Sequence, residues 1–396
     1  MLDELRVTNY KSFSGSTSIP LRPITVLIGK NNSGKTAATR LPLLLNAAID
    51  PKRTRPMGPL PLAVGSIRFG SSLNDLIHGQ NPHGQISLGF SVSDVLGRSS
   101  KLDVDIQLRQ SLTTSNQGFI SRYHMGETLR LDWDRRSRPT EDRLSVLDVD
   151  FIGLHPLLPP RTDIDTYEEL ARLRDELTGI THISSLRRTL SPIYENREPD
   201  ETNFSDGSEI PYLMMASESL LDQVNGWYEK NLGTRLTIEA EASSFQIKAG
   251  VRNPQNLAQS GQGLQQVLPI VASYKAVTGG RNESTILTIE EPEVHLHPAA
   301  QAGIADLATE AVNQQSNFQT ILETHSENLI LRLRRHVASG LLSPDMVNIL
   351  WFDRLNEQSS VREILIDKNG AVDSWPDGVF SEDLQEVRAI IKSAKS

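Results

Sequence analysis

The 396-residue chain contains no cysteine. This absence excludes disulfide bonds and thiolate metal sites, and it suits a reducing compartment. The N-terminus, MLDELRVTNYKSF, lacks the apolar core of a signal peptide, and the apolar stretch at 41–49 is too short to span a bilayer. The net charge of −9 argues against a uniformly basic surface but allows a local basic patch. We therefore expect a soluble, cytoplasmic protein with no membrane partner.

The middle of the chain also lacks a repeat. No heptad pattern persists between residues 110 and 240, which excludes a long coiled-coil arm. Helices are expected at 165–177 and 217–232, with an acidic loop at 195–209. One short cluster could clamp a nucleic acid, but a solvated face is the favoured interpretation because such clusters are common on surfaces. This cluster consists of Arg187, Arg188 and Arg197 with Tyr194.

The chain does contain a phosphate loop. A buried strand is expected at 24–28, and the following segment fits G-x-x-x-x-G-K-[ST] without departure. Its two glycines let successive N–H groups point at phosphate oxygens, Lys35 supplies a charge for the β- and γ-phosphates, and Thr36 can ligate Mg²⁺. We expect a helix at 36–48, kinked or interrupted by Pro42. The loop comprises Gly29, Lys30, Asn31, Asn32, Ser33, Gly34, Lys35 and Thr36.

Two adjacent carboxylates end a second buried strand. The run at 285–289 is apolar and β-branched, as in a strand covered on both faces of a parallel sheet, and Glu290 and Glu291 follow it. The carboxyl edge of such a sheet is where ligands bind. A solvated acidic turn is the alternative, because charged residues are common at strand ends.

A third segment, SGQG, opens a helical pattern at 264–271. Small residues with free N–H groups at a helix start can bind an anion. By itself the segment is better explained as a plain helix cap. Its position one helix before the carboxylate strand favours the anion site. It comprises Ser260, Gly261, Gln262 and Gly263.

The order of these motifs, GKNNSGKT, SGQG, ILTIEEPEVHLHP and then ETHS, resembles the ABC-type ATPase heads. Within them the chain resembles the branch shared by RecF, the structural-maintenance-of-chromosomes (SMC) proteins and the overcoming-lysogenization-defect (OLD) ATPases. The tail from 363 to 380 resembles a small C-terminal domain of unknown function found on ATPases of this group. The resemblance implies an α/β fold, an ABC-type P-loop ATPase head with a mainly helical insertion between the Walker A and signature motifs.

The resemblance also implies residue roles for ATP and Mg²⁺. The phosphate loop becomes Walker A, with Lys35 in a catalytic role, and residues 260–263 become the signature loop. Glu290 stands where the family usually has the Walker B aspartate that holds Mg²⁺, so Thr36 and Glu290 are the expected metal residues. Glu291 matches the carboxylate that activates water. The segment at 293–297 matches the D-loop, and His325 matches the switch histidine that senses the γ-phosphate.

Four parts are expected: residues 1–110 and 244–342 as the two lobes of the head, 111–243 as the insertion, and 343–396 as a strand–hairpin–helix extension. Strands are expected at 85–92, 101–108, 319–323, 346–352, 361–366 and 371–375, the last two joined through 368–370 as a hairpin. Helices are expected at 327–337 and, at the end of the chain, from 381. Gln80 could sense the metal or γ-phosphate, but a loop glutamine in water is favoured. His295 and His297 favour a turn over a metal pair.

In this family the signature loop of one subunit closes over ATP held by its partner. The resemblance therefore implies a homodimer that closes head-to-head on ATP and opens on hydrolysis. One hypothesis is a sensor or clamp that works with nucleic acid or an effector nuclease, in anti-phage defence or DNA repair. The alternative is a scaffold that holds a toxic effector protein without touching nucleic acid. A transporter subunit fits poorly, and the short tail after His325 argues against a self-contained nuclease.

Overall fold

Both motif strands lie in one six-stranded sheet, in the order β12, β17, β18, β3, β19, β20. The computed structural model describes residues 1–50, 58–109, 117–133, 149–199, 207–278, 285–356 and 358–376. The strands are β12 (Gly179–Ile183), β17 (Thr285–Glu290), β18 (Phe318–Glu323), β3 (Ile24–Gly29), β19 (Val347–Leu355) and β20 (Gln358–Ile364). Neighbours pair in parallel, except for the antiparallel edge strand β20. The predicted strands at 24–28 and 285–289 are confirmed, and β18 separates them.

A second six-stranded sheet is antiparallel, in the order β2, β1, β6, β7, β8, β9. Its strands are β2 (Thr17–Pro20), β1 (Leu2–Thr8), β6 (Gln85–Ser93), β7 (Ser99–Arg109), β8 (Gln117–Met125) and β9 (Leu129–Asp132). Strands β8, β9 and β12 all come from the segment 111–243. The described part of this segment is thus less helical than its sequence suggested. Its strands β8 and β12 pair with β7 and β17, which lie outside the segment, and such long-range pairing is not visible in the local sequence. The four-part division of the chain stays a prediction.

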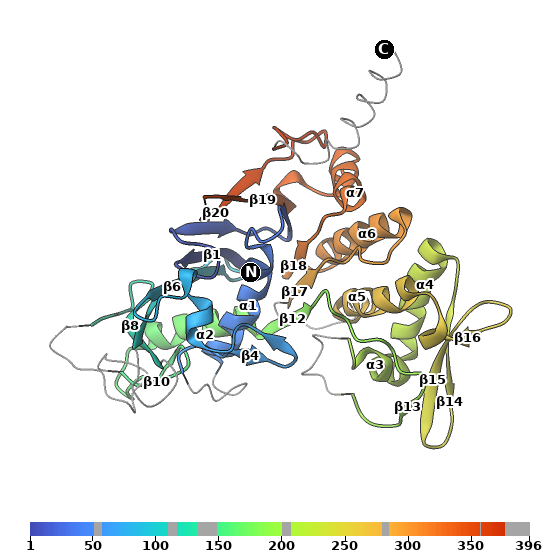
Figure 1. The fold of residues 1–396 in the computed structure, drawn as a ribbon, viewed down its shortest axis with the longest axis horizontal. Coiled ribbons are helices and arrows are strands. Elements are labelled where there is room, and N and C mark those ends of the chain that lie inside the picture. Colours follow the sequence, from blue (N-terminus) through green and yellow to red (C-terminus); the bar gives the residue numbers. More distant parts are fainter. Residues whose placement is uncertain are drawn as a thin grey trace, which may run out of the picture.

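Helices separate and cover the two sheets. Helices α1 (Lys35–Ile49) and α2 (Ile164–Thr178) pack with the antiparallel sheet on one face of the central sheet (Figure 1). The other face packs against α3 (Ile210–Ala216), α4 (Glu218–Leu232), α5 (Gln262–Thr278), α6 (Pro298–Gln314) and α7 (Glu327–Ala338). The central sheet therefore has a hydrophobic core on each face: the first core lies against α1, α2 and the antiparallel sheet, and the second core lies against α3 to α7. In β3, Leu27 packs in the first core and Val26 in the second, as alternation along a strand requires.

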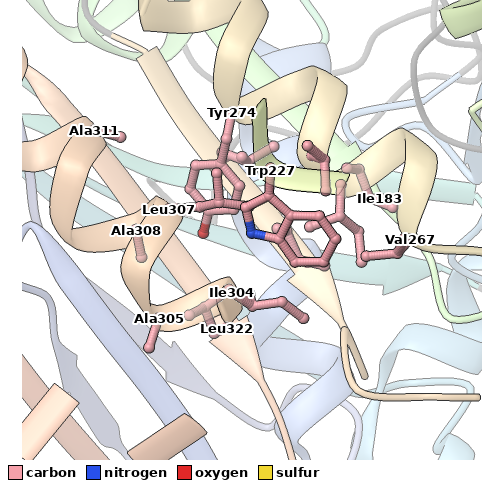
Figure 2. Close-up of a cluster of buried hydrophobic side chains, with 14 of the residues drawn as sticks. Ile183, Trp227, Val267, Tyr274, Ile304, Ala305, Leu307, Ala308, Ala311 and Leu322 are labelled. Carbon is pink, nitrogen blue, oxygen red and sulfur yellow. The ribbon is translucent and has the colours of Figure 1, made fainter. Parts of the chain in front are cut away.

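The second core centres on Trp227 of α4 (Figure 2). Its side chain is 5% exposed, and its indole N–H donates to the carbonyl of Gly303 in α6 over 3.0 Å. A Cβ on Gly303 would lie 3.2 Å from the Trp227 ring and 2.5 Å from the Asn231 amide oxygen. The glycine therefore permits the close approach of the two helices.

The predicted helices at 165–177 and 217–232 are confirmed as α2 and α4. The structure shows no interruption of α1 at Pro42, because buried leucines on both sides fix the helix in the core. The expected helix from Ser381 lies outside the described residues. The expected hairpin is present in a short form: Ile366 and Val372 form an antiparallel bridge, and the N–H groups of Asp367 and Asp373 donate to the carbonyls of Ala371 and Leu365. The strand before it, β20, pairs with β19.

The remaining elements are short. They are β4 (Ala63–Val64), β5 (Ile67–Arg68), η1 (Leu73–Leu76), η2 (His78–Gln80), β10 (Phe151–Ile152), β11 (His155–Pro156), β13 (Tyr194–Glu195), β14 (Leu236–Ala240), β15 (Ser244–Ala249), β16 (Gln255–Asn256), η3 (Leu257–Gln259) and η4 (Pro344–Met346).

Candidate nucleotide-binding site

The phosphate loop joins β3 to α1 with two glycines in conformations that other residues rarely adopt. Gly29 has φ +143° and Gly34 has φ +100°. A Cβ on Gly29 would lie 2.0 Å from the carbonyl oxygen of Phe352 in β19. Both glycines are therefore required by geometry as well as by the motif.

Lys35 lies at the start of α1 and reaches back across the loop. Its ammonium donates to the carbonyls of Gly29 and Lys30, over 2.9 Å and 2.8 Å. Burial lowers the pKa of Lys35, against the opposing charges of Glu323, Glu291 and Glu293. The cation thus lies against two backbone carbonyl oxygens, within the influence of three carboxylates, and a phosphate group could replace the carbonyls.

One cavity of about 620 Å³ brings most of the expected site residues together. Lys35, Thr36, Glu291 and His325 all line it. Its other lining residues are Lys11, Ser12, Asn31, Asn32, Ser33, Gly34, Ala37, Asp75, Ile77, His78, Gly79, Gln80, Glu323 and Arg354. The lining includes neither Glu290 nor residues 260–263. Residues 260–263 instead lie at the start of α5, with Gly261 and Gln262 exposed to solvent.

Glu291 follows β17 at the rim of this cavity. Its φ of +42° is rare for a residue with a side chain, and such strain clusters at functional sites. Its N–H donates to the carbonyl of Glu323 over 2.8 Å. Arg187 donates from one nitrogen to the carbonyls of Glu290 and Glu291, each over 2.8 Å. The turn that carries the carboxylate is therefore held from both sides.

Arg187 differs from its interpretation as a solvated surface residue. Its side chain is buried, and burial lowers its pKa to about 10 despite the neighbouring charges of Glu293, Glu291 and Glu290. Arg197 is also engaged, in a two-nitrogen ion pair with Glu209. Sequence alone could not reveal these partners, because they lie 12 to 104 positions away along the chain.

One side chain joins the turn at 293–297 to His325. The Glu293 carboxylate accepts from the backbone N–H of His325 over 2.6 Å and from the Thr324 hydroxyl over 2.7 Å. Partial burial and the charge of Lys35 lower the pKa of His325, against Glu293 and Glu291. The imidazole is therefore neutral at pH 7 and can accept or donate a hydrogen bond.

Glu290 is enclosed behind the cavity instead of facing Thr36. Arg40 of α1 pairs with both of its carboxylate oxygens, one of them over 2.9 Å from Nη2. His182 Nε2 lies 3.2 Å from one oxygen, and the Ser185 N–H donates to the other over 3.2 Å. Burial alone would raise the pKa of Glu290, but Arg40 and His182 lower it to about 2. Its assignment as the metal carboxylate stays a prediction.

The sequence analysis did not single out Glu323, the last residue of β18. The Thr36 hydroxyl donates to its Oε1 over 2.7 Å, and the Thr39 hydroxyl donates to Oε2 over 3.3 Å. Burial raises its pKa to about 7, with a further contribution from the charge of Glu290. The available signal was its position, a carboxylate at the end of a strand that precedes the switch histidine.

Gln80 is the last residue of η2 and has φ +54°. It lines the cavity and is exposed to solvent, so the favoured expectation of a loop glutamine in water stays a prediction. His295 and His297 lie in the turn that leads into α6, where His297 caps the helix by accepting from the Ala299 N–H. This arrangement agrees with the turn interpretation.

Comparison with known proteins now decides the family. Residues 24–332 match the family described as "AAA domain, putative AbiEii toxin, Type IV TA system". The chain belongs to this family. Residues 342–390 match a second one, "Protein of unknown function (DUF3696)". Among the residues that the structure describes, no helix combines the length and apolarity needed to cross a bilayer.

This AAA-domain protein is similar to two nucleases. It is 23% identical to the OLD nuclease of Thermus scotoductus over 341 residues, which are 82% of this chain and 59% of that protein. It is 22% identical to the Old nuclease of Escherichia phage P2 over 382 residues, which are 86% of this chain and 58% of that protein. The chain thus spans about three fifths of the length of the curated relatives it matches.

A solved structure shares its fold. The head described as "SmcHead bound to the C-winged helix domain of ScpA" has a TM-score of 0.53 at 12% identity, covering 93% of this chain and 99% of that one. Together these findings confirm the predicted α/β class, an ABC-type P-loop ATPase head of the RecF, SMC and OLD branch with a DUF3696 region.

Proposed function

We propose that the protein binds ATP with Mg²⁺ and hydrolyses it, and that nucleotide drives its heads together as a homodimer. The observation that supports this most is the single cavity in which Lys35, Thr36, Glu291 and His325 converge. Its chemistry fits the group: N–H donors and a cation for phosphate, and a hydroxyl beside a carboxylate for the metal.

The proposed roles follow from position. Lys35 binds the β- and γ-phosphates when its ammonium leaves the two loop carbonyls. Glu291 accepts a proton from the attacking water, and the Arg187 contacts keep the backbone behind it fixed. His325, held by Glu293, contacts the γ-phosphate. Bound Mg²⁺ would neutralise charge on the phosphate oxygens.

The proposed dimer explains why the expected signature segment lies outside the cavity. Residues 260–263 do not line it, and Gly261 and Gln262 are exposed at the start of α5. A helix start with free N–H groups is suited to bind the phosphate held by a second subunit. We expect ATP to lie between Walker A of one subunit and the signature segment of its partner.

The proposed output is regulation of a partner. The related proteins are nucleases, and the SMC head of similar fold is bound to a winged-helix domain of ScpA. We therefore infer a sensor or clamp that acts with nucleic acid or with an effector nuclease, in anti-phage defence or DNA repair. A scaffold that restrains a toxic effector is the alternative. DNA-stimulated hydrolysis with a steep salt dependence would favour the clamp, whereas indifference to DNA would favour the scaffold.

The test measures phosphate release and molar mass for the wild type and Glu291→Gln. A matched control is Glu310→Gln, because Glu310 is an exposed carboxylate of α6 away from the cavity. We expect Glu291→Gln to bind ATP, to turn over at least a hundredfold more slowly, and to double its mass with ATP. Wild-type turnover in this variant would refute Glu291 as the base, and a monomer at saturating ATP would refute the dimer.

A further inference from the structure

Two carboxylates occupy neighbouring positions at the carboxyl edge of the central sheet. Glu290 ends β17 and Glu323 ends β18, and the two residues pair directly in the strand register. Both side chains are buried. Only Glu323 lines the cavity. The two groups therefore have different surroundings although they lie side by side.

Both carboxylate oxygens of Glu290 already have partners. Its oxygens contact the guanidinium of Arg40, the ring of His182 and the N–H of Ser185. Moving Glu290 toward Thr36 would leave the Arg40 cation half-buried without its partner, which is costly. The Arg40 pair also ties α1, which begins with Walker A, to the end of β17. These contacts indicate that the Glu290 carboxylate has a structural role as an anion.

Glu323 has the geometry that Glu290 lacks. Its Oε1 lies 2.7 Å from the hydroxyl of Thr36, the Walker A residue suited to ligate the metal. Magnesium keeps several waters and binds through one or two carboxylates together with substrate phosphates. Within the described part of the chain, no group of three or more His, Cys, Asp or Glu residues could hold a metal ion. Metal binding at Thr36 should therefore depend on nucleotide phosphates.

We propose that Glu323 is the carboxylate that receives nucleotide-bound Mg²⁺ beside Thr36, and that Glu290 is a structural anion that fastens α1 to β17 through Arg40. This inference rests on the proposed binding of ATP. It reassigns the metal role from Glu290, the last residue of β17, to Glu323, the last residue of the neighbouring strand β18.

The test measures metal affinity separately from nucleotide affinity. The variants are Glu323→Gln and Glu290→Gln, with Glu310→Gln as the exposed control. Isothermal titration with ATP in EDTA gives metal-free nucleotide binding. Electron paramagnetic resonance of Mn²⁺ titrated into the complex with a non-hydrolysable ATP analogue then gives metal affinity without any turnover. Glutamine preserves the size of the side chain and can still accept the Thr36 hydrogen bond.

We expect Glu323→Gln to bind metal-free ATP within twofold of wild type and to bind Mn²⁺ at least tenfold more weakly, as loss of a charged contact implies. Glu290→Gln should keep Mn²⁺ affinity within threefold of wild type and unfold at a lower temperature. The variant Glu323→Asp, which keeps the charge on a shorter chain, should bind Mn²⁺ more tightly than Glu323→Gln. It also serves as the test, against wild type, should the glutamine variant not fold.

The outcomes separate the two proposals. Wild-type Mn²⁺ affinity in both Glu323 variants, or a tenfold loss in Glu290→Gln with none in Glu323→Gln, would overturn this inference and leave ATP binding intact. A wild-type protein that binds no ATP in either buffer would overturn the proposed function and this inference with it.

Discussion

Replacing Gly29 with alanine should separate the phosphate loop from the strand beside it. The φ of +143° at Gly29 is nearly exclusive to glycine, and an added Cβ would lie 2.0 Å from the carbonyl oxygen of Phe352. The obstacle is backbone of β19, so no flexible side chain can move aside. Backbone strain costs about 1–3 kcal/mol, and overpacking adds about 1–3 kcal/mol.

Gly29→Ala should therefore lower the free energy of unfolding by about 2–6 kcal/mol. The matched control is Gly233→Ala. Gly233 ends α4 with φ +65°, and a Cβ there would meet nothing within 4 Å. Its substitution should cost about 1–2 kcal/mol, from the left-handed backbone alone.

The assay is equilibrium unfolding in urea, followed by tryptophan fluorescence, with the ATP affinity of each folded variant measured alongside. We expect a lower unfolding midpoint and weaker ATP binding for Gly29→Ala than for Gly233→Ala. Equal midpoints for the two variants would refute the close contact between the phosphate loop and β19.

Two further predictions concern stability. Burial raises the pKa of Asp306, but its contacts with His336 and Arg332 lower it to about 2, well below the ordinary value for an aspartate. The stabilising effect of these contacts is therefore present above about pH 4 and is lost as the pH falls toward 2. Asp306→Asn should lower the free energy of unfolding, measured in urea, by about 2 kcal/mol at pH 7 and by progressively less between pH 4 and 3. A loss of stability that does not change with pH would contradict the ion pairs of Asp306. Trp227→Ala should lower the free energy of unfolding by about 3–5 kcal/mol. The control Leu96→Ala, at a side chain that is 74% exposed, should lower it by less than about 0.5 kcal/mol. Similar unfolding midpoints for the two variants would contradict the central role of Trp227 in the second core.

The parts of the site that local sequence encodes were predictable. The loop at 29–36 follows a continuous apolar strand, and 285–289 has the composition that a doubly covered strand requires. Lys35, Thr36, Glu291 and His325 meet in one cavity because these strands are parallel and their carboxyl ends lie at one edge.

The parts that depend on distant pairing were not predictable. The side-by-side register of Glu290 and Glu323 arises only once β18 lies between β17 and β3. Arg40 and Arg187 reach the β17 edge from segments 250 and 103 positions away. A basic residue gives no local sign of such a partner, so a solvated position was the natural expectation for Arg187, and Arg40 was not singled out.

The pairing of β8 with β7 and of β9 with β8 likewise could not be predicted, because composition alone does not show which strands lie side by side. Pro42 shows the reverse case, in which a strong local signal yields to packing. Its neighbours Leu41, Leu43 and Leu44 are buried, and the helix continues through it.

Calorimetric titration of ATP with Mg²⁺ into the wild type and Lys35→Ala tests the central claim most directly. The Lys35 ammonium is buried in the cavity, where one charged hydrogen bond contributes about 1.5–3 kcal/mol. We predict saturable binding by the wild type and affinity at least tenfold weaker in Lys35→Ala. Equal affinity for ATP in both proteins would contradict the assignment of this cavity as the nucleotide site.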